Sequence, residues 1–254
     1  IRRPPRSTLF PYTTLFRSLG KFDPEWTDHL AARIAASITR ANNSLREARL
    51  GCGRTFVTDS SHNRRFGKTI DPELALIKIT DSDENPLALV VNFAGHPILD
   101  PDDGLVSPDY PGLLARKLDA DFGFGFFLQG ALGDLNAGSR ERSDKWKQAG
   151  LADSIAERLH KAIAEAYDAI PVRAEIRLTS LTASFELPEV DFNLMPDLLF
   201  PLEWLFNSLI SWPAEYPLQG IRIGDAAILA TASELSGRPG LQINRERPGP
   251  FALL

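Results

Sequence analysis

Apolar residues recur along the chain with two different spacings, and these spacings predict both helices and strands. Leu30, Ile34 and Ile38 lie four residues apart, which places them on one face of a helix that runs to about residue 49. Asp23, followed directly by a proline, is a typical helix start, because its side chain accepts from the free N–H groups of the first turn. The glycine-containing stretch 51–53 is expected to end this helix.

Farther along, short apolar runs alternate with longer amphipathic stretches. Short runs bounded by polar turns predict strands, whereas apolar residues at steps of four predict helices. The predicted strands cover residues 74–80, 87–94, 124–129, 174–185, 219–223 and 226–232. The predicted helices cover residues 109–119 and 144–168. This alternation predicts an α/β fold of layered mixed β-sheets flanked by amphipathic helices.

Composition narrows the class of protein. Hydrophobic residues make up 43% of the chain and charged residues 24%, as in ordinary soluble globular domains. The formal net charge of −5 argues against a nucleic-acid partner, which calls for clustered Lys and Arg. The single cysteine, Cys52, excludes an internal disulfide and a cysteine-based zinc cluster. No apolar run is long enough to be expected to cross a bilayer.

Residues 1–18 read differently from the rest of the chain. They lack the continuous apolar stretch of a signal peptide, and they match, codon by codon, a widely used sequencing adapter in one reading frame. We therefore expect residues 1–18 to be an artefact of a gene assembled from environmental reads. The fold is expected to occupy residues 19–254.

Polar residues that follow the predicted strands are the candidates for chemistry, since α/β proteins commonly build their sites there. His96 follows the strand at 87–94 and is either a metal ligand, a general base or a histidine satisfied by hydrogen bonds. Glu234 follows the strand at 226–232 and is a zinc ligand, a general base or the first acidic residue of a helix.

Three further polar residues lie in loops. Asp134 and Asn136 belong to a glycine-rich turn, where a turn-forming role competes with a catalytic one. Arg64, with its neighbours Asn63 and Arg65, either binds an anion or carboxylate in bidentate fashion or belongs to a solvated basic loop. The local pattern leaves His62, its near neighbour, without an assigned role.

Several short motifs occur in a recognisable order. They lie at residues 63–64, 71–74, 92–97, 106–112, 128–134, 223–225 and 233–234. In this order they resemble the N-terminal catalytic domain of the neutral/alkaline non-lysosomal ceramidase family. The resemblance extends over roughly residues 23–254, nearly all of the sequence outside the adapter-like segment.

The resemblance implies a zinc ion held by two histidines, a glutamate and a tyrosine. By motif position His96 and Glu234 are two of these four ligands, and Arg64 lines the site. The first histidine of the family would fall where residues 1–18 stand, and the tyrosine beyond residue 254. Asn136 occupies the position of the family's serine, so hydrolysis would rely on zinc-activated water, with Asn136 donating to a developing oxyanion.

We therefore expect a fragment of a zinc-dependent amide hydrolase that acts on ceramide or a related lipid amide. Asp134, Asn136 and Arg64 are its expected catalytic residues, and His96 and Glu234 its expected metal ligands. The resemblance implies a secreted or periplasmic parent protein, and a chain with two ligands is expected to be inactive by itself. The alternative is a non-catalytic relative that binds a lipid or glycan through the aromatic-rich stretch 190–217.

Overall fold

A computed structural model describes residues 23–65, 67–99, 107–138, 150–186, 215–246 and 251–253. The adapter-like segment 1–18 and most of the aromatic-rich stretch 190–217 lie outside these ranges. The chain divides into two compact units. The smaller comprises residues 1–46 and 184–216, and the larger comprises residues 47–183 and 217–254.

The smaller unit contains helix α2, Pro24–Asn43, whose start agrees with the sequence prediction. The side chain of Asp23 accepts hydrogen bonds from the N–H groups of Glu25 and Trp26, at 2.9 and 3.1 Å. The end of the helix was predicted wrongly. It stops at Asn43, before the predicted residue 49, and no residue of α2 is buried.

The larger unit is built on a sheet with the strand order β1-β3-β4-β5. Its strands are Arg49–Phe56, Glu73–Thr80, Pro86–Phe93 and Phe124–Gln129. The first two pairings are antiparallel, and β5 pairs with β4 in parallel. Helix α3, Asp109–Phe122, makes the crossover that a parallel pair requires.

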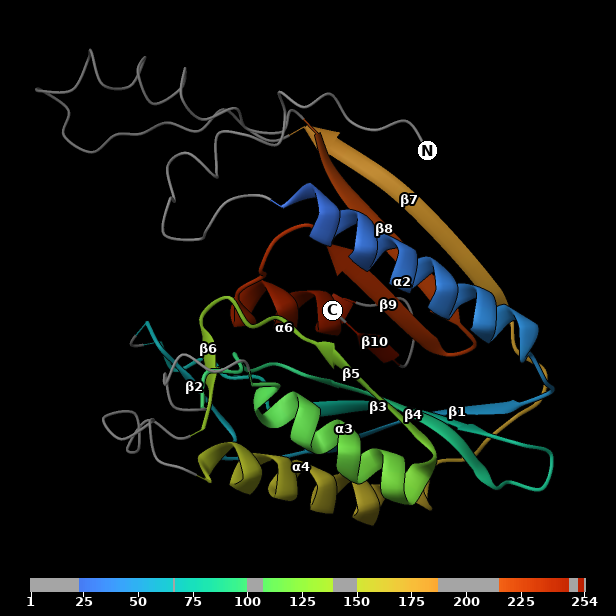
Figure 1. Ribbon diagram of the computed structural model, residues 1–254. Coiled ribbons are helices and arrows are strands. Elements are labelled where there is room, and N and C mark those ends of the chain that lie inside the picture. The colour runs from blue at the N-terminus through green and yellow to red at the C-terminus, as the bar shows by residue number, and fades with distance from the viewer. Residues whose placement is uncertain are drawn as a thin grey trace, which may run out of the picture. The chain divides into compact units, whose positions relative to one another are not determined.

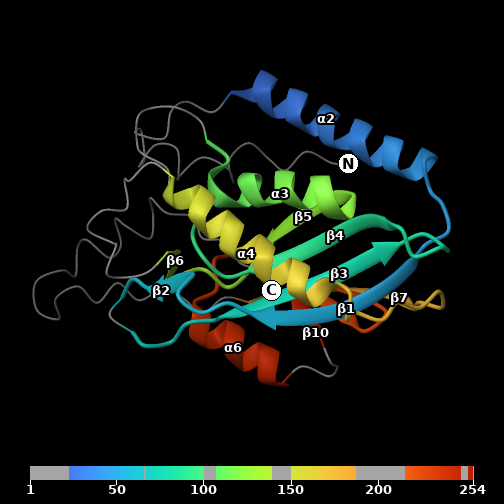
Figure 2. The ribbon, with the colours of Figure 1, turned by 90° about the horizontal axis from the view of Figure 1, so that it is seen from below.

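Both faces of this sheet are covered. Helices α3 and α4, Leu151–Tyr167, lie across one face (Figure 2) and pack on its strands. Leu74 and Leu76 of β3 point into the core beneath these helices, whereas Ala75 and Ile77 belong to a second core on the other face. This alternation is the period-2 pattern of a strand, here buried on both sides.

A second sheet forms the next layer (Figure 1). Its order is β10-β9-β8-β7, with strands Phe251–Leu253, Ala226–Thr231, Glu215–Ile223 and Leu178–Glu186. Strands β8 and β9 form the predicted hairpin around Gly224, whose φ of 61° suits a glycine. Ala226 of β9 and the half-buried Cys52 of β1 share the core between the two sheets. The predicted α/β fold of layered sheets and amphipathic helices is confirmed.

Three short elements complete the part that carries the site. Strands β2, Ser61–Asn63, and β6, Leu135–Ala137, form an antiparallel pair, and His96 bridges to Asn136 on the other side of β6. Helix α6, Gly237–Glu246, follows β9. The sequence patterns did not predict β2 or β6, and a helix near α6 was one of the alternatives stated for Glu234. The three elements bring the predicted polar residues to one end of the larger unit.

Among the described helices, none is both long and apolar enough to pass through a membrane.

Candidate functional site

His96 is fixed by backbone contacts on its Nδ1 side. Its Nδ1 lies 3.0 Å from the carbonyl oxygen of Leu132 and 3.2 Å from that of Leu135. Because both partners are acceptors, Nδ1 carries a proton, and in the neutral ring Nε2 presents a lone pair. The backbone N–H of His96 donates to the Leu135 oxygen at 2.9 Å and holds the peptide against the same turn. The ring is therefore locked in the tautomer that makes Nε2 a metal ligand or a base.

Glu234 faces that free nitrogen. Its Oε2 lies 3.5 Å from His96 Nε2, and the glutamate side chain is 62% exposed while that of His96 is 17% exposed. The separation of 3.5 Å is longer than the roughly 2.7–2.9 Å of a charge-assisted N–H···O bond.

Asp134 connects the two halves of this site. One carboxylate oxygen accepts from the backbone N–H of Gly237, at the start of α6, and the other accepts from Asn63 Nδ2, both at 2.7 Å. The N–H of Gly133 donates to the Leu235 carbonyl oxygen at 2.7 Å. The turn that orients His96 is thus bonded directly to the segment that carries Glu234.

Arg64 and Asn136 lie beside this turn. Arg64 donates from Nη2 to the Gly133 carbonyl oxygen at 2.8 Å, and its backbone N–H donates to the backbone carbonyl oxygen of Asp134 at 2.9 Å. Asn136 is 7% exposed, and its Oδ1 has no hydrogen-bond partner among the described residues. A buried amide oxygen without a partner is costly, so its retention is typical of functional positions.

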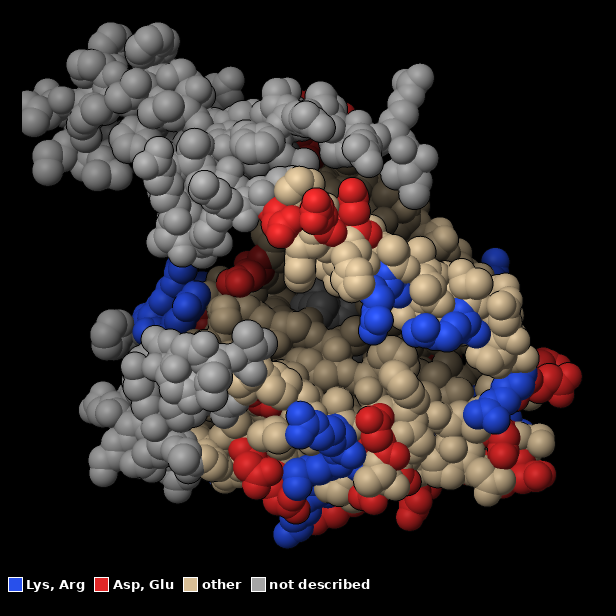
Figure 3. Space-filling model, viewed as in Figure 1, with Lys and Arg blue, Asp and Glu red and all other residues tan. Residues whose placement is uncertain are grey.

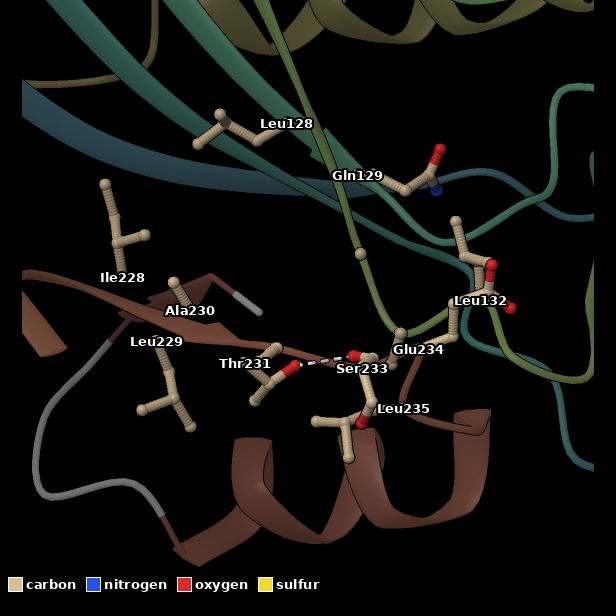
Figure 4. A pocket seen from close by; sticks show the side chains of 13 residues that line it. Leu128, Gln129, Leu132, Ile228, Leu229, Ala230, Thr231, Ser233, Glu234 and Leu235 are labelled. Carbon is tan, nitrogen blue, oxygen red and sulfur yellow. Dashed lines mark hydrogen bonds between the residues drawn. The ribbon is translucent and has the colours of Figure 1, made fainter. Parts of the chain in front are cut away.

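A cavity of about 480 Å³ opens next to Glu234 between the ends of β5 and β9. Leu128 of β5 and Ile228 and Ala230 of β9 line its inner part, and Thr231, Ser233 and Glu234 line the end toward α6 (Figure 4). On the face shown in Figure 3, charged side chains of both signs lie scattered among uncharged residues. Glu234, which faces His96, stands at one end of the mostly apolar cavity.

Gly133 is required where the two halves of the site meet. A Cβ atom at this position would lie 3.0 Å from the carbonyl oxygens of both Glu234 and Leu235. We expect Gly133→Ala to destabilise the fold by about 1–3 kcal/mol, because the contact is with backbone that cannot move aside. Urea unfolding measures this loss. The matched control is Gly220→Ala, since no atom lies within 4 Å of its Cβ position. Equal stability of the two variants would contradict the prediction.

The structure brings all five predicted site residues into one region, but not into one metal-binding cluster. His96 and Glu234 face each other, whereas Asp134 and Arg64 bond to the turn between them. Across the described ranges, no group of three or more His, Cys, Asp and Glu side chains can hold a metal ion. The sequence pattern grouped Asn63 with Arg64 and Arg65, either as an anion- or carboxylate-binding segment or as a solvated loop, and in the structure Asn63 donates to the Asp134 carboxylate at 2.7 Å.

Comparison with known proteins identifies the fold. No protein-family model matches the chain, and no curated protein matches it. Among solved structures, the neutral ceramidase from Pseudomonas aeruginosa matches with a TM-score of 0.68 and 17% identity, over 87% of this chain and 47% of that one. A ceramidase complexed with C2 matches with a TM-score of 0.66 and 16% identity, over 85% and 47%. The chain thus spans about half the length of these structures and shares the fold of that part.

Proposed function

We propose that the chain carries part of the zinc site of an amide hydrolase that acts on ceramide or a related lipid amide. The observation that carries the proposal is the pair formed by His96 Nε2 and Glu234 Oε2, two acceptors 3.5 Å apart. The ceramidase-like fold and the resemblance of the motifs support the same function.

The spacing of the pair fits zinc. Zinc bonds of about 2.0–2.1 Å to nitrogen and about 2.0–2.2 Å to oxygen, at a tetrahedral angle, place the two ligand atoms about 3.4 Å apart. The separation of 3.5 Å between His96 Nε2 and Glu234 Oε2 is close to this value. The proton on Nδ1, held by two carbonyl oxygens, leaves Nε2 free for the ion.

When bound, zinc would polarise the amide carbonyl and lower the pKa of a coordinated water toward neutrality. The chain's own residues orient the reacting groups. Asn136 stands on β6 next to His96, where its amide can donate to the oxygen that gains charge. Arg64 uses one N–H group on Gly133, which fixes the guanidinium group beside the turn. Asp134 has both oxygens engaged, so its role in the proposal is to hold Glu234 near His96.

The cavity supports a substrate with an apolar chain. Its inner walls are formed by leucine, isoleucine and alanine side chains, and Glu234 lies at one end. An acyl chain in this cavity would bury apolar surface while the amide group stays near the polar pair. The proposed partner is therefore a lipid amide. The alternative, a non-catalytic relative, places lipid or glycan binding in residues 190–217, most of which lie outside the described ranges.

Zinc titration of the metal-free chain tests the site. We expect one saturable and readily chelated zinc per chain, because two protein ligands give a weaker site than three or four. Absence of saturable binding would overturn the proposal. Turnover is best measured on the longest reading frame that contains this sequence, with a fluorescent N-acylsphingosine in detergent micelles. Tight binding of that lipid without release of fatty acid would favour the non-catalytic alternative.

A further inference from the structure

The loop that carries His96 is anchored on both sides by two consecutive residues of α3. The Tyr110 hydroxyl donates to the carbonyl oxygen of Gly95 at 2.6 Å, directly before His96. The Asp109 carboxylate accepts from the N–H of Leu99 at 2.6 Å, a short distance after it. Both bonds are buried. The peptide of His96 is therefore held between two fixed points on one helix turn.

Asp109 adopts an unusual backbone conformation to make this contact. Its φ is 48°, in the left-handed region that costs a non-glycine residue about 1–2 kcal/mol. In this conformation its second carboxylate oxygen accepts from the N–H of Tyr110 at 2.6 Å. Strain of this kind persists where the surrounding structure requires it, most often near functional sites. Here it lets one carboxylate connect the first turn of α3 to the far side of the His96 loop.

Tyr110 is fixed as firmly as the loop that it holds. Its side chain is fully buried, and its ring meets Phe93 and Phe127 edge to face, with centroids 6.2 and 5.6 Å apart. Gln129 Nε2 also donates to the Gly95 oxygen, at 3.2 Å. Burial raises the pKa of Tyr110 well above its usual range, so the hydroxyl stays protonated and remains a donor.

We propose that Tyr110 is a positioning residue for His96. Its hydroxyl, through the carbonyl of Gly95, sets the orientation of the peptide that carries His96 and so aims Nε2 at Glu234. The proposal rests on the proposed zinc site for its functional meaning. Tyr110 touches neither the proposed zinc position nor Glu234, so it acts through the loop.

Tyr110→Phe is the test variant, because it removes the hydroxyl and keeps the aromatic packing. We expect zinc affinity to fall by about 10-fold, since outer contacts of metal ligands are worth 10–100-fold in affinity. Tyr167→Phe is the chemical control, as the buried Tyr167 hydroxyl has no hydrogen-bond partner among the described residues. Ile163→Val, in the core of α4, is the stability control, with an expected cost of about 1 kcal/mol, similar to one lost hydrogen bond. Both controls should keep the wild-type zinc affinity.

A second measurement does not depend on zinc. Long-range ¹H–¹⁵N NMR of the metal-free chain reports the imidazole tautomer of His96, which we expect to be the Nδ1–H form in the wild type. Tyr110→Phe should mix the two tautomers, while Ile163→Val should not. If the wild type binds no zinc but the tautomer responds, the zinc proposal fails and the positioning role stands. If Tyr110→Phe changes neither zinc affinity nor tautomer beyond the controls, the positioning role is overturned.

Discussion

Replacing His96 with alanine is expected to weaken zinc binding by more than about 100-fold. Loss of a hydrogen bond to a metal ligand alone lowers metal affinity by up to about 100-fold, and loss of the ligand itself should cost more. The substitution removes the only nitrogen that faces Glu234 within the described site. The glutamate that remains is exposed, and by itself it binds a divalent ion as weakly as any surface carboxylate. Competition with a chromophoric chelator measures the affinity of both proteins, and thermal unfolding confirms that the variant is folded.

His62→Ala provides the matched control for this experiment. His62 is also half-buried, and its Nδ1 lies 2.8 Å from a backbone carbonyl oxygen, that of Gly138. It pairs with Asn136 from the opposite side of β6 to His96. Loss of zinc binding in His62→Ala but not in His96→Ala would show that the ion belongs to the other side of β6.

Asp134→Ala should lower the free energy of unfolding by about 3 kcal/mol. The change removes two hydrogen bonds to the carboxylate, one from the N–H of Gly237 and one from the side-chain amide of Asn63, which keeps its bond to the Thr69 carbonyl oxygen at 3.2 Å. Each hydrogen bond to a charged group contributes about 1.5–3 kcal/mol, and partial exposure of the turn places the sum at the lower end. The negative charge at the start of α6 adds a smaller helix-dipole contribution. Urea unfolding followed by circular dichroism measures the difference.

Asp134→Asn divides this effect into its parts. The asparagine oxygen can still accept from Gly237, whereas its amide group meets the amide of Asn63 as a second donor. The side-chain amide of Asn63 cannot flip freely, because its Oδ1 already accepts from the N–H groups of Arg65 and Gly67. We expect about half of the loss seen in Asp134→Ala, and no loss in the exposed control Asp83→Ala. Wild-type stability in both Asp134 variants would remove the proposed link between the two halves of the site.

The parts of the fold that local pattern determines were predictable. Strands β3, β4 and β5, the α3 and α4 helices and the β8–β9 hairpin all follow from apolar spacing and turn residues. Strand β1 was mistaken for the end of a helix because of its glycines. A Cβ at Gly51 would lie 2.2 Å from the carbonyl oxygen of Pro171, and one at Gly53 would lie 2.5 Å from Ile170. These glycines permit close packing with a segment far along the chain, which local pattern does not reveal.

The candidate site was likewise predictable from the sequence only in part. His96 and Glu234 were identifiable because each follows an apolar strand, but their separation depends on how β9 packs beside β5. Tyr110 lies within the motif at 106–112 and Asn63 within the loop at 63–65, but the sequence did not predict that they contact Gly95 and Asp134. Their importance comes from partners at Gly95 and Asp134, which only the folded chain brings near.

The half-buried thiol of Cys52 has a practical consequence. It packs in the core between the two sheets, and burial, followed by the nearby charge of Asp225, raises its pKa. A thiol with a raised pKa and restricted access is alkylated slowly in the native state. Because the chain has one cysteine, its rate of alkylation reports separation of the two sheets without any engineered label. Cys52 is thus a natural chemical probe of the separation of the two sheets.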